Sequence, residues 1–142
     1  MSFFDKFKSK DKEYPELDTN SPTAQLLDKM KNSLESFAAQ VKDPLEIVPS
    51  GDTTYVFIGK PPKVFGFVWV QKEGVFNMKK VIAEKGIPPT EFQLLSDELR
   101  DAYQKSEATQ RYTTKLAGKT IIVISSEILA NDLEKVIKKI QK

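Results

Sequence analysis

Apolar residues recur at helical spacing in four stretches of the chain, and the residues at the ends of these stretches favour helix boundaries. Ser21 and Pro22 favour a helix start, because serine accepts a hydrogen bond from a free amide and proline at the first helical position loses none. The residue before Pro44 disfavours helix and marks the end. The sequence predicts a long first helix between them, with an apolar stripe of Leu26, Leu27, Met30, Leu34, Phe37 and Val41.

Three further helices are predicted in the same way. Asn77 and Gly86 delimit a short one, as an N-cap and a C-terminal glycine. Thr90 and Gln93 form a capping-box pattern in front of a helix that runs to about Glu107. The last helix has the clearest apolar stripe, which consists of Ile128, Leu129, Leu133, Val136, Ile137 and Ile140.

Strand-forming runs separated by turn residues fill the space between these helices. Short turns join the first three runs, which predicts an antiparallel meander, and Val75 and Phe76 add a brief fourth pairing. Ala117 and Gly118 turn a second hairpin. The five runs are residues 45–48, 53–58, 64–71, 112–116 and 119–125.

The element order predicts an α+β protein of about five mainly antiparallel strands with helices packed on the sheet, in the order α-βββ-αα-ββ-α. Residues 1–20 are interpreted as a flexible N-terminal arm and residues 21–142 as one domain. This order is loosely similar to that of sensor and adaptor modules, at the level of architecture only, and a fold does not determine function.

Three strands fail to alternate apolar and polar residues, although a strand with one wet face should. We therefore expect both faces of the sheet to be buried, either by the predicted helices or by a partner or apolar ligand on one face. The residues expected to be mostly buried are Phe57, Ile58, Phe67, Val68, Ile122 and Val123.

The composition excludes several kinds of chemistry. The chain has no cysteine and no histidine, so it has no disulfides, thiolate nucleophiles, imidazole bases or zinc ligands of the usual kinds. The net charge is only +2 and two residues are arginine, which argues against specific nucleic-acid recognition. We expect a cytoplasmic protein, since no apolar stretch is long enough for a signal or a membrane span. We also expect no cofactor, since the usual metal and haem ligands are absent.

Two patterns that suggest catalysis are better explained otherwise. Gly118-Lys119-Thr120 resembles the end of a phosphate loop, but Thr113 stands where the upstream glycine is required. Asp97, Glu98 and Asp101 form an acidic cluster on a helix whose apolar face lies elsewhere, so we expect a solvated face. No catalytic residue and no metal ligand is predicted.

Two regions are candidates for partner or ligand contact. Gly66 lies inside an apolar strand, where glycine indicates either a bulge or a close approach to the backbone. A flat ligand over Gly66 would lie beside Phe65, Phe67 or Trp69, although tryptophan belongs more often to a core. The other region is the connection formed by Lys60, Pro61, Pro62 and Lys63, interpreted as a rigid hairpin turn or a partner-facing tip.

The beginning of the chain carries a third candidate. Phe3, Phe4 and Phe7 lie among Lys6, Lys8, Lys10 and Lys12. Such a segment can rest on an anionic membrane surface, aromatics inward, or dock on the protein's own core. The choice between docking, disorder and membrane contact stays open.

Three functions follow from these observations. The first hypothesis is a non-enzymatic protein-interaction or regulatory module that binds a protein partner or self-associates, for instance as a homodimer, with weak contact to an anionic membrane left open. The alternative is a sensor that binds an apolar small molecule. The third is a small enzyme that uses carboxylate or lysine chemistry.

Overall fold

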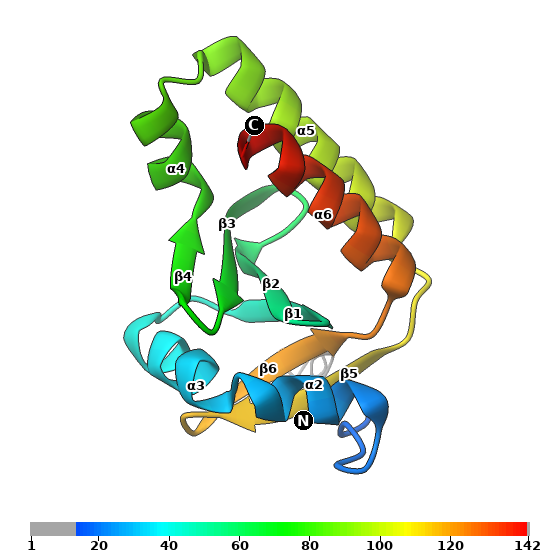
Figure 1. Ribbon diagram of the computed structural model, residues 1–142. Helices are drawn as coiled ribbons and strands as arrows, with labels where there is room; N and C mark the ends of the chain where they lie inside the picture. Colours follow the sequence, from blue (N-terminus) through cyan, green and yellow to red (C-terminus); the bar gives the residue numbers. More distant parts are fainter. Residues whose placement is uncertain (1–13, 142) are drawn as a thin grey trace, which may run out of the picture.

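The computed structural model describes residues 14–141 and has the α+β architecture that the sequence predicts (Figure 1). A mixed six-stranded sheet has the strand order β4-β3-β2-β1-β6-β5. Within the described residues, five helices pack on it. The strands are β1 (Leu45–Ser50), β2 (Thr53–Lys60), β3 (Val64–Gln71), β4 (Gly74–Asn77), β5 (Arg111–Leu116) and β6 (Lys119–Ile124). The helices are α2 (Pro22–Lys29), α3 (Lys31–Gln40), α4 (Met78–Lys85), α5 (Pro89–Lys105) and α6 (Glu127–Gln141).

Both predicted hairpins form, and the brief fourth pairing is a strand of its own. The meander β1-β2-β3-β4 is antiparallel throughout, and so is the pair β5-β6. The two units join through a parallel pair, in which Glu46 and Ile47 of β1 lie opposite Ile122 and Val123 of β6. The sequence does not predict this parallel join, because the strands involved are far apart in the chain.

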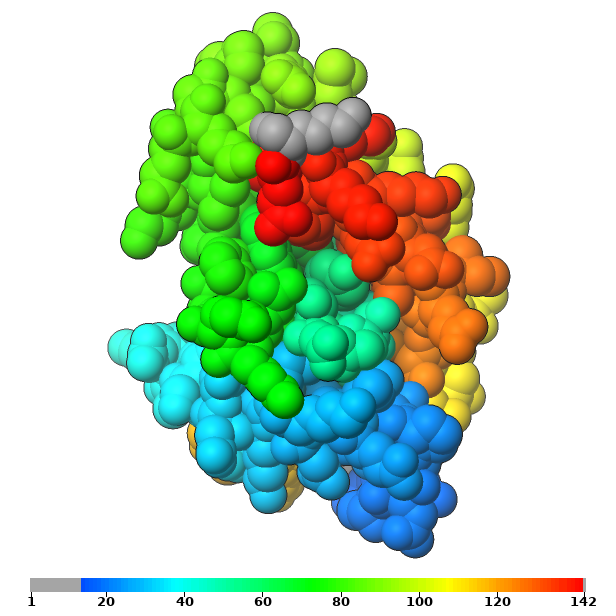
Figure 2. All heavy atoms as spheres, viewed as in Figure 1, coloured from blue at the N-terminus to red at the C-terminus, as the bar shows by residue number. Residues whose placement is uncertain are grey.

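Helices cover both faces of the sheet, which accounts for the strands that fail to alternate. Leu27, Leu34 and the rest of one apolar cluster lie between the sheet and α2 and α3. A second cluster lies under α4, α5 and α6. Figure 1 shows these helices on the side of the sheet opposite α2 and α3, and Figure 2 shows the same view with all atoms. Of the residues expected to be buried, Ile58 and Ile122 are only partly buried, and the buried ones are Phe57, Phe67, Val68 and Val123. The fold therefore needs no partner to cover a bare sheet face.

Two details of the helices differ from the sequence prediction. The predicted first helix is interrupted at Met30, which is buried and leaves the helical conformation. The break separates α2 from α3. The prediction of a capping box at Thr90 is wrong, because α5 already begins at Pro89 and the Gln93 side chain donates instead to Asp97 (3.0 Å).

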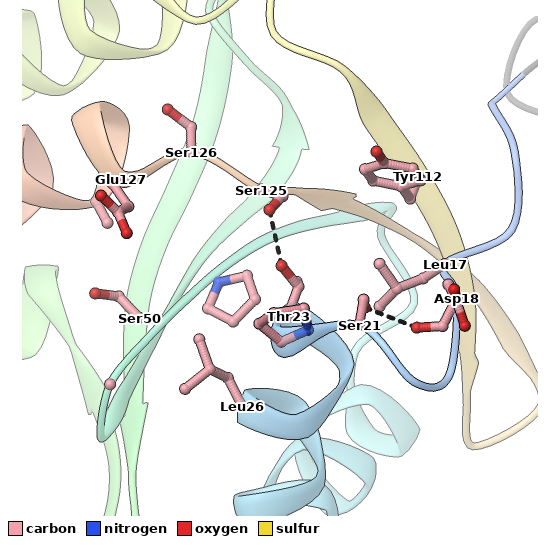
Figure 3. Close-up of a pocket in the computed structure, with 14 residues that line it drawn as sticks. Leu17, Asp18, Ser21, Thr23, Leu26, Ser50, Tyr112, Ser125, Ser126 and Glu127 are labelled. Atoms are coloured by element: carbon pink, nitrogen blue, oxygen red, sulfur yellow. Dashed lines mark hydrogen bonds between the residues drawn. The ribbon is translucent and has the colours of Figure 1, made fainter.

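The N-caps at Ser21 and Asn77 are confirmed, as is the C-terminal glycine at Gly86. Pro15 and Leu17 hydrogen-bond to Thr113 of β5, so this part of the chain lies along the sheet edge. The hydroxyl groups of Thr23 and Ser125 are 2.8 Å apart and join α2 to the end of β6 (Figure 3). Within residues 14–141, no helix has the length and apolar character to cross a membrane.

Candidate functional site

A groove of about 440 Å³ runs along the first half of β3. Its walls are formed by residues 63–67, residues 77–79, Ile58 and one side of α5. The α5 side consists of Phe92, Gln93, Ser96, Leu99 and Arg100. We call this site the β3-edge groove.

Side chains from both faces of β3 line the groove, which places the groove at the edge of this strand. Phe65 and Phe67 belong to the face covered by α4 to α6. Val64 and Gly66 occupy the alternate positions of the strand, which face the opposite side of the sheet. The ladder between β3 and β4 begins only at Val68, which pairs with Asn77. Residues 64–67 therefore pair with β2 on one side, and in the described part of the chain no strand pairs with them on the other.

Nothing in the fold requires glycine at position 66. The register between β2 and β3 runs without interruption through the Gly66–Ile58 pair, so the bulge interpretation is wrong. A Cβ atom at this position would meet Ile58 at 3.7 Å, an ordinary contact. Gly59 differs, since a side chain there would be strained by the φ of +107° and would lie only 3.2 Å from the Val64 carbonyl oxygen. Gly66 is exposed, so its backbone is open to approach from solvent.

The groove combines an apolar floor with a cationic rim. Phe65, Phe67 and Met78 provide the floor, and the Phe65 ring packs edge-on against Phe57 at 5.4 Å between centroids. Lys63, Lys79 and Arg100 provide the rim, and none of the described residues that line the groove carries a carboxylate. Val64 adds an apolar side chain that is 77% exposed. The site suits an apolar group attached to an anionic one.

Arg100 is positioned by three contacts. Its Nε donates to the Pro62 carbonyl (2.7 Å), its Nη1 donates to Asp97 (2.9 Å), and its guanidinium lies 5.6 Å from the centre of the Phe65 ring. No residue in the range 14–141 accepts from its Nη2. The side chain is 33% exposed, so this nitrogen is available to an anionic ligand.

The structure brings together two of the residues singled out in the sequence. Lys63 and Gly66 both line the groove, and Pro62 contributes its carbonyl to Arg100. Lys60 and Pro61 belong to the same connection but do not line the groove.

Trp69 belongs to the core, not to the site. It is 1% exposed, stacks on Phe76 at 5.9 Å, and its Nε1 has no hydrogen-bond partner among the described residues. Phe3, Phe4 and Phe7 lie outside the described residues.

Sequence reasoning missed the α4 and α5 side of the groove. Lys79, Phe92 and Arg100 reach it only because the chain after β4 folds back over the edge of β3. The sole hint in the sequence is that Arg100 is one of two arginines in a lysine-rich chain.

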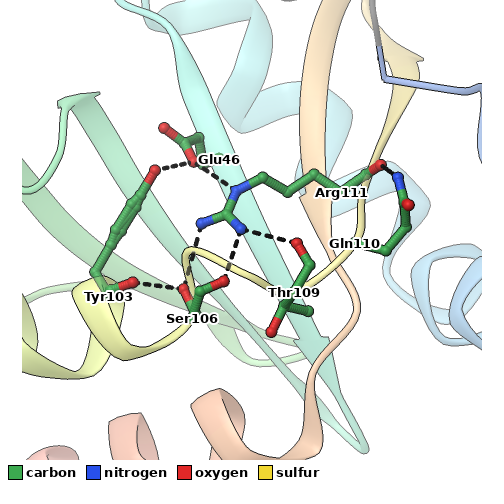
Figure 4. Close-up of polar contacts among 6 residues, drawn as sticks. All are labelled: Glu46, Tyr103, Ser106, Thr109, Gln110 and Arg111. Atoms are coloured by element: carbon green, nitrogen blue, oxygen red, sulfur yellow. Dashed lines mark hydrogen bonds and ion pairs between the residues drawn. The ribbon is translucent and has the colours of Figure 1, made fainter.

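The other arginine belongs to a buried polar network between α5, β1 and β5 (Figure 4). Arg111 donates to the carbonyls of Ser106 (2.8 Å) and Thr109 (3.1 Å), and its Nε lies 4.0 Å from the Glu46 carboxylate. Tyr103 donates to the same carboxylate (2.5 Å). The Glu46 and Arg111 side chains are 13% and 6% exposed. We call these residues the Glu46 network.

Burial and the neighbouring Glu46 carboxylate raise the pKa of Tyr103 well above its ordinary value of 10.0, because both disfavour the phenolate, while Arg111 lowers it in part. Burial, with a smaller contribution from Glu134, raises the pKa of Tyr55 to about 12. Both groups stay neutral at physiological pH. The Glu46 network therefore holds one carboxylate and one guanidinium whose charges compensate each other.

The acidic cluster of α5 lies at the surface, as the sequence predicts. Asp97 pairs with Arg100, Glu98 contacts Lys139 of α6, and Asp101 is exposed. No group of three or more acidic side chains within residues 14–141 is arranged to hold a metal ion.

Comparison of the chain with protein-family models, with curated proteins and with solved structures gave no significant match. The site therefore has to be interpreted from its own geometry.

Proposed function

We propose that this protein is a non-enzymatic interaction module that binds an extended, acidic peptide segment of a partner protein by strand addition along β3. The observation that carries the proposal is the position of the groove, at a strand edge whose pairing with β4 stops at Val68. An added strand satisfies such an edge through main-chain hydrogen bonds, and adjacent pockets select its side chains.

The groove chemistry supports a peptide of alternating character. Side chains of an extended peptide point alternately to the two sides, so every second one can enter the apolar floor beside Phe65 and Met78. The others lie near Lys63, Lys79 and Arg100, where carboxylates are favoured. The exposed Gly66 allows the peptide backbone to approach the strand closely.

A hexapeptide that alternates glutamate with valine or phenylalanine, blocked at both ends, tests the proposal. Binding is followed by amide NMR of the full chain, with the Gly66 amide as the reporter. We expect saturable shifts at residues 63–67 and 77–79. Two matched peptides serve as controls, one with lysine in place of glutamate and one with proline in place of every second residue. Proline cannot donate to a ladder, so strand addition predicts at least tenfold weaker binding for that peptide.

A Gly66→Ala variant separates binding from folding. Since the added Cβ makes an ordinary contact with Ile58, we expect thermal stability to stay equal or rise slightly. We expect peptide affinity to fall about tenfold, while Thr120→Val on the distant β6 leaves it unchanged. Equal affinity of the wild-type protein for the glutamate and proline peptides would exclude strand addition.

The alternative, a sensor for an apolar small molecule, uses the same groove. Its volume of about 440 Å³ lies in the usual range of ~300–1,000 Å³ for ligand sites, and the rim restricts the ligand to an amphipathic anion. Decanoate is therefore titrated in parallel with the peptides. Decanoate binding without peptide binding would replace the strand-addition proposal with the sensor.

A further inference from the structure

A second cavity, of about 610 Å³, lies beyond the carboxyl ends of β1 and β6, the parallel pair of the sheet (Figure 3). At this point the chain leaves β1 through Gly51 into a hairpin and leaves β6 into α6. Leu26 of α2 and Ala130 of α6 border the cavity from the two opposite faces of the sheet. We call it the strand-end cavity. A crevice where parallel strands end and their connections diverge is a common place for ligands.

Hydroxyl groups dominate the polar lining of this cavity, and among residues 14–141 no lysine or arginine lines it. The hydroxyl-bearing residues are Ser21, Thr23, Ser50, Tyr112, Ser125 and Ser126. The two charged residues, Asp18 and Glu127, are both acidic. A carboxylate or phosphate ligand would be repelled by these groups, so the lining disfavours anions.

The helix ends at the cavity are already capped. The Ser21 hydroxyl accepts from the Ala24 amide and the Ser126 hydroxyl accepts from the Leu129 amide, both at 3.1 Å. Thr23 and Ser125 bond to each other. These four side chains build the wall.

Besides the Asp18 carboxylate, whose Oδ1 accepts from the Asn20 amide (2.9 Å), three polar groups remain for a ligand. Within residues 14–141, the Ser50 hydroxyl, the Tyr112 hydroxyl and the Glu127 carboxylate have no hydrogen-bond partner. They come from β1, β5 and α6, and Figure 3 shows Ser50 and Glu127 on one side of the space and Tyr112 on the other. Two can donate or accept and one can only accept. A neutral ligand with several hydroxyl groups matches this set, and its apolar ring face can rest on Pro49 or Leu26.

We propose that the strand-end cavity binds a small neutral carbohydrate, a mono- or disaccharide. This site is independent of the β3-edge groove and of the function proposed for it.

The test is a titration of the full chain with glucose, maltose and N-acetylglucosamine, followed by amide NMR, with putrescine and phosphate as the cationic and anionic comparators. We expect saturable shifts at Ser50, Gly51 and Ser125 with at least one saccharide, and none at Gly66. Glu127→Gln and Ser50→Ala should each weaken that binding by about fivefold or more, whereas Ser36→Ala on the exposed side of α3 should not.

Thermal melting of each variant confirms that it is folded. Absence of shifts with all three saccharides would overturn the proposal. Binding of putrescine or phosphate alone would overturn it too, because the cavity would then select charge and not hydroxyl groups.

Discussion

The two arginines of this chain make similar contacts in different surroundings. Arg100 lies 5.6 Å from the Phe65 ring, and Arg111 lies 5.3 Å from the Tyr103 ring. Each also donates to main-chain carbonyl oxygen, Arg100 to Pro62 and Arg111 to Ser106 and Thr109. Their exposure differs, since the Arg100 side chain is 33% exposed and that of Arg111 is 6% exposed.

This difference in exposure separates a binding role from a structural one. Arg111 lies beside the buried carboxylate of Glu46, so its removal would take a cation away from a buried anion. The carboxylate partner of Arg100, Asp97, is exposed and can be solvated by water. The same residue type therefore stabilises the fold at one position and is available to a ligand at the other.

The largest effect should come from Arg111→Met. Methionine keeps much of the apolar volume but removes the guanidinium that lies beside the buried Glu46 carboxylate, and loss of one member of a buried ion pair costs on the order of 3–5 kcal/mol. Urea denaturation at pH 7 measures the free energy of unfolding. The double variant Glu46→Gln/Arg111→Met should recover part of the loss, because it removes the buried charge as well. A loss below about 1 kcal/mol in the single variant would contradict the structural role of Arg111.

Tyr103→Phe should cost less, about 1–3 kcal/mol at pH 7, since it removes one hydrogen bond to a charged acceptor. The same variant should also change how the free energy of unfolding depends on pH in the alkaline range. Because the folded-state pKa of Tyr103 lies above the unfolded value of 10.0, the unfolded chain releases this proton first as the pH rises past 10.

The wild-type free energy of unfolding therefore falls above pH 10, and Tyr103→Phe should reduce that slope. Tyr55→Phe should reduce it too, because the pKa of Tyr55 is raised to about 12. Urea denaturation at several pH values between 8 and about 11 measures the slopes. Identical slopes in the wild type and both variants would contradict the neutral, buried state of these tyrosines.

Arg100→Lys tests most directly the difference in role between the two arginines. Lysine keeps the positive charge but loses the planar fork, so we expect a stability loss of about 1 kcal/mol or less, given the exposure of the site. Affinity for the alternating glutamate peptide should fall about fivefold, measured by the NMR titration. Lys115→Glu on β5, an exposed change far from the groove, is the control for non-specific charge effects.

The smallest effect is the salt dependence of the two sites. Peptide binding in the β3-edge groove should weaken about two- to threefold between roughly 50 and 300 mM salt, since exposed ion pairs are screened. Saccharide binding in the strand-end cavity should stay constant, because the ligand is neutral. Equal salt dependence at the two sites would contradict the contrast in their chemistry.

The amino-acid sequence by itself determines most of the secondary structure of this protein. Periodicity, caps and turn residues are local properties, so they predict the four-strand meander, the second hairpin and the caps at Ser21 and Asn77. The failure of alternation in three strands also indicates two buried sheet faces, which α2 and α3 on one side and α4 to α6 on the other provide. Gly66 is a candidate from the sequence because glycine is unusual inside an apolar strand, and Lys63 is one because it belongs to the connection of two lysines and two prolines.

Only the tertiary structure decides how these elements meet. The parallel pairing of β1 with β6, the break at Met30 and the partnership of Glu46 with Arg111 all join residues through long-range packing, which local propensity does not encode. The same holds for the β3-edge groove. Its rim comes from Lys63, Lys79 and Arg100, and they face one space because β4 stops at Asn77 and the chain folds back across the open edge of β3.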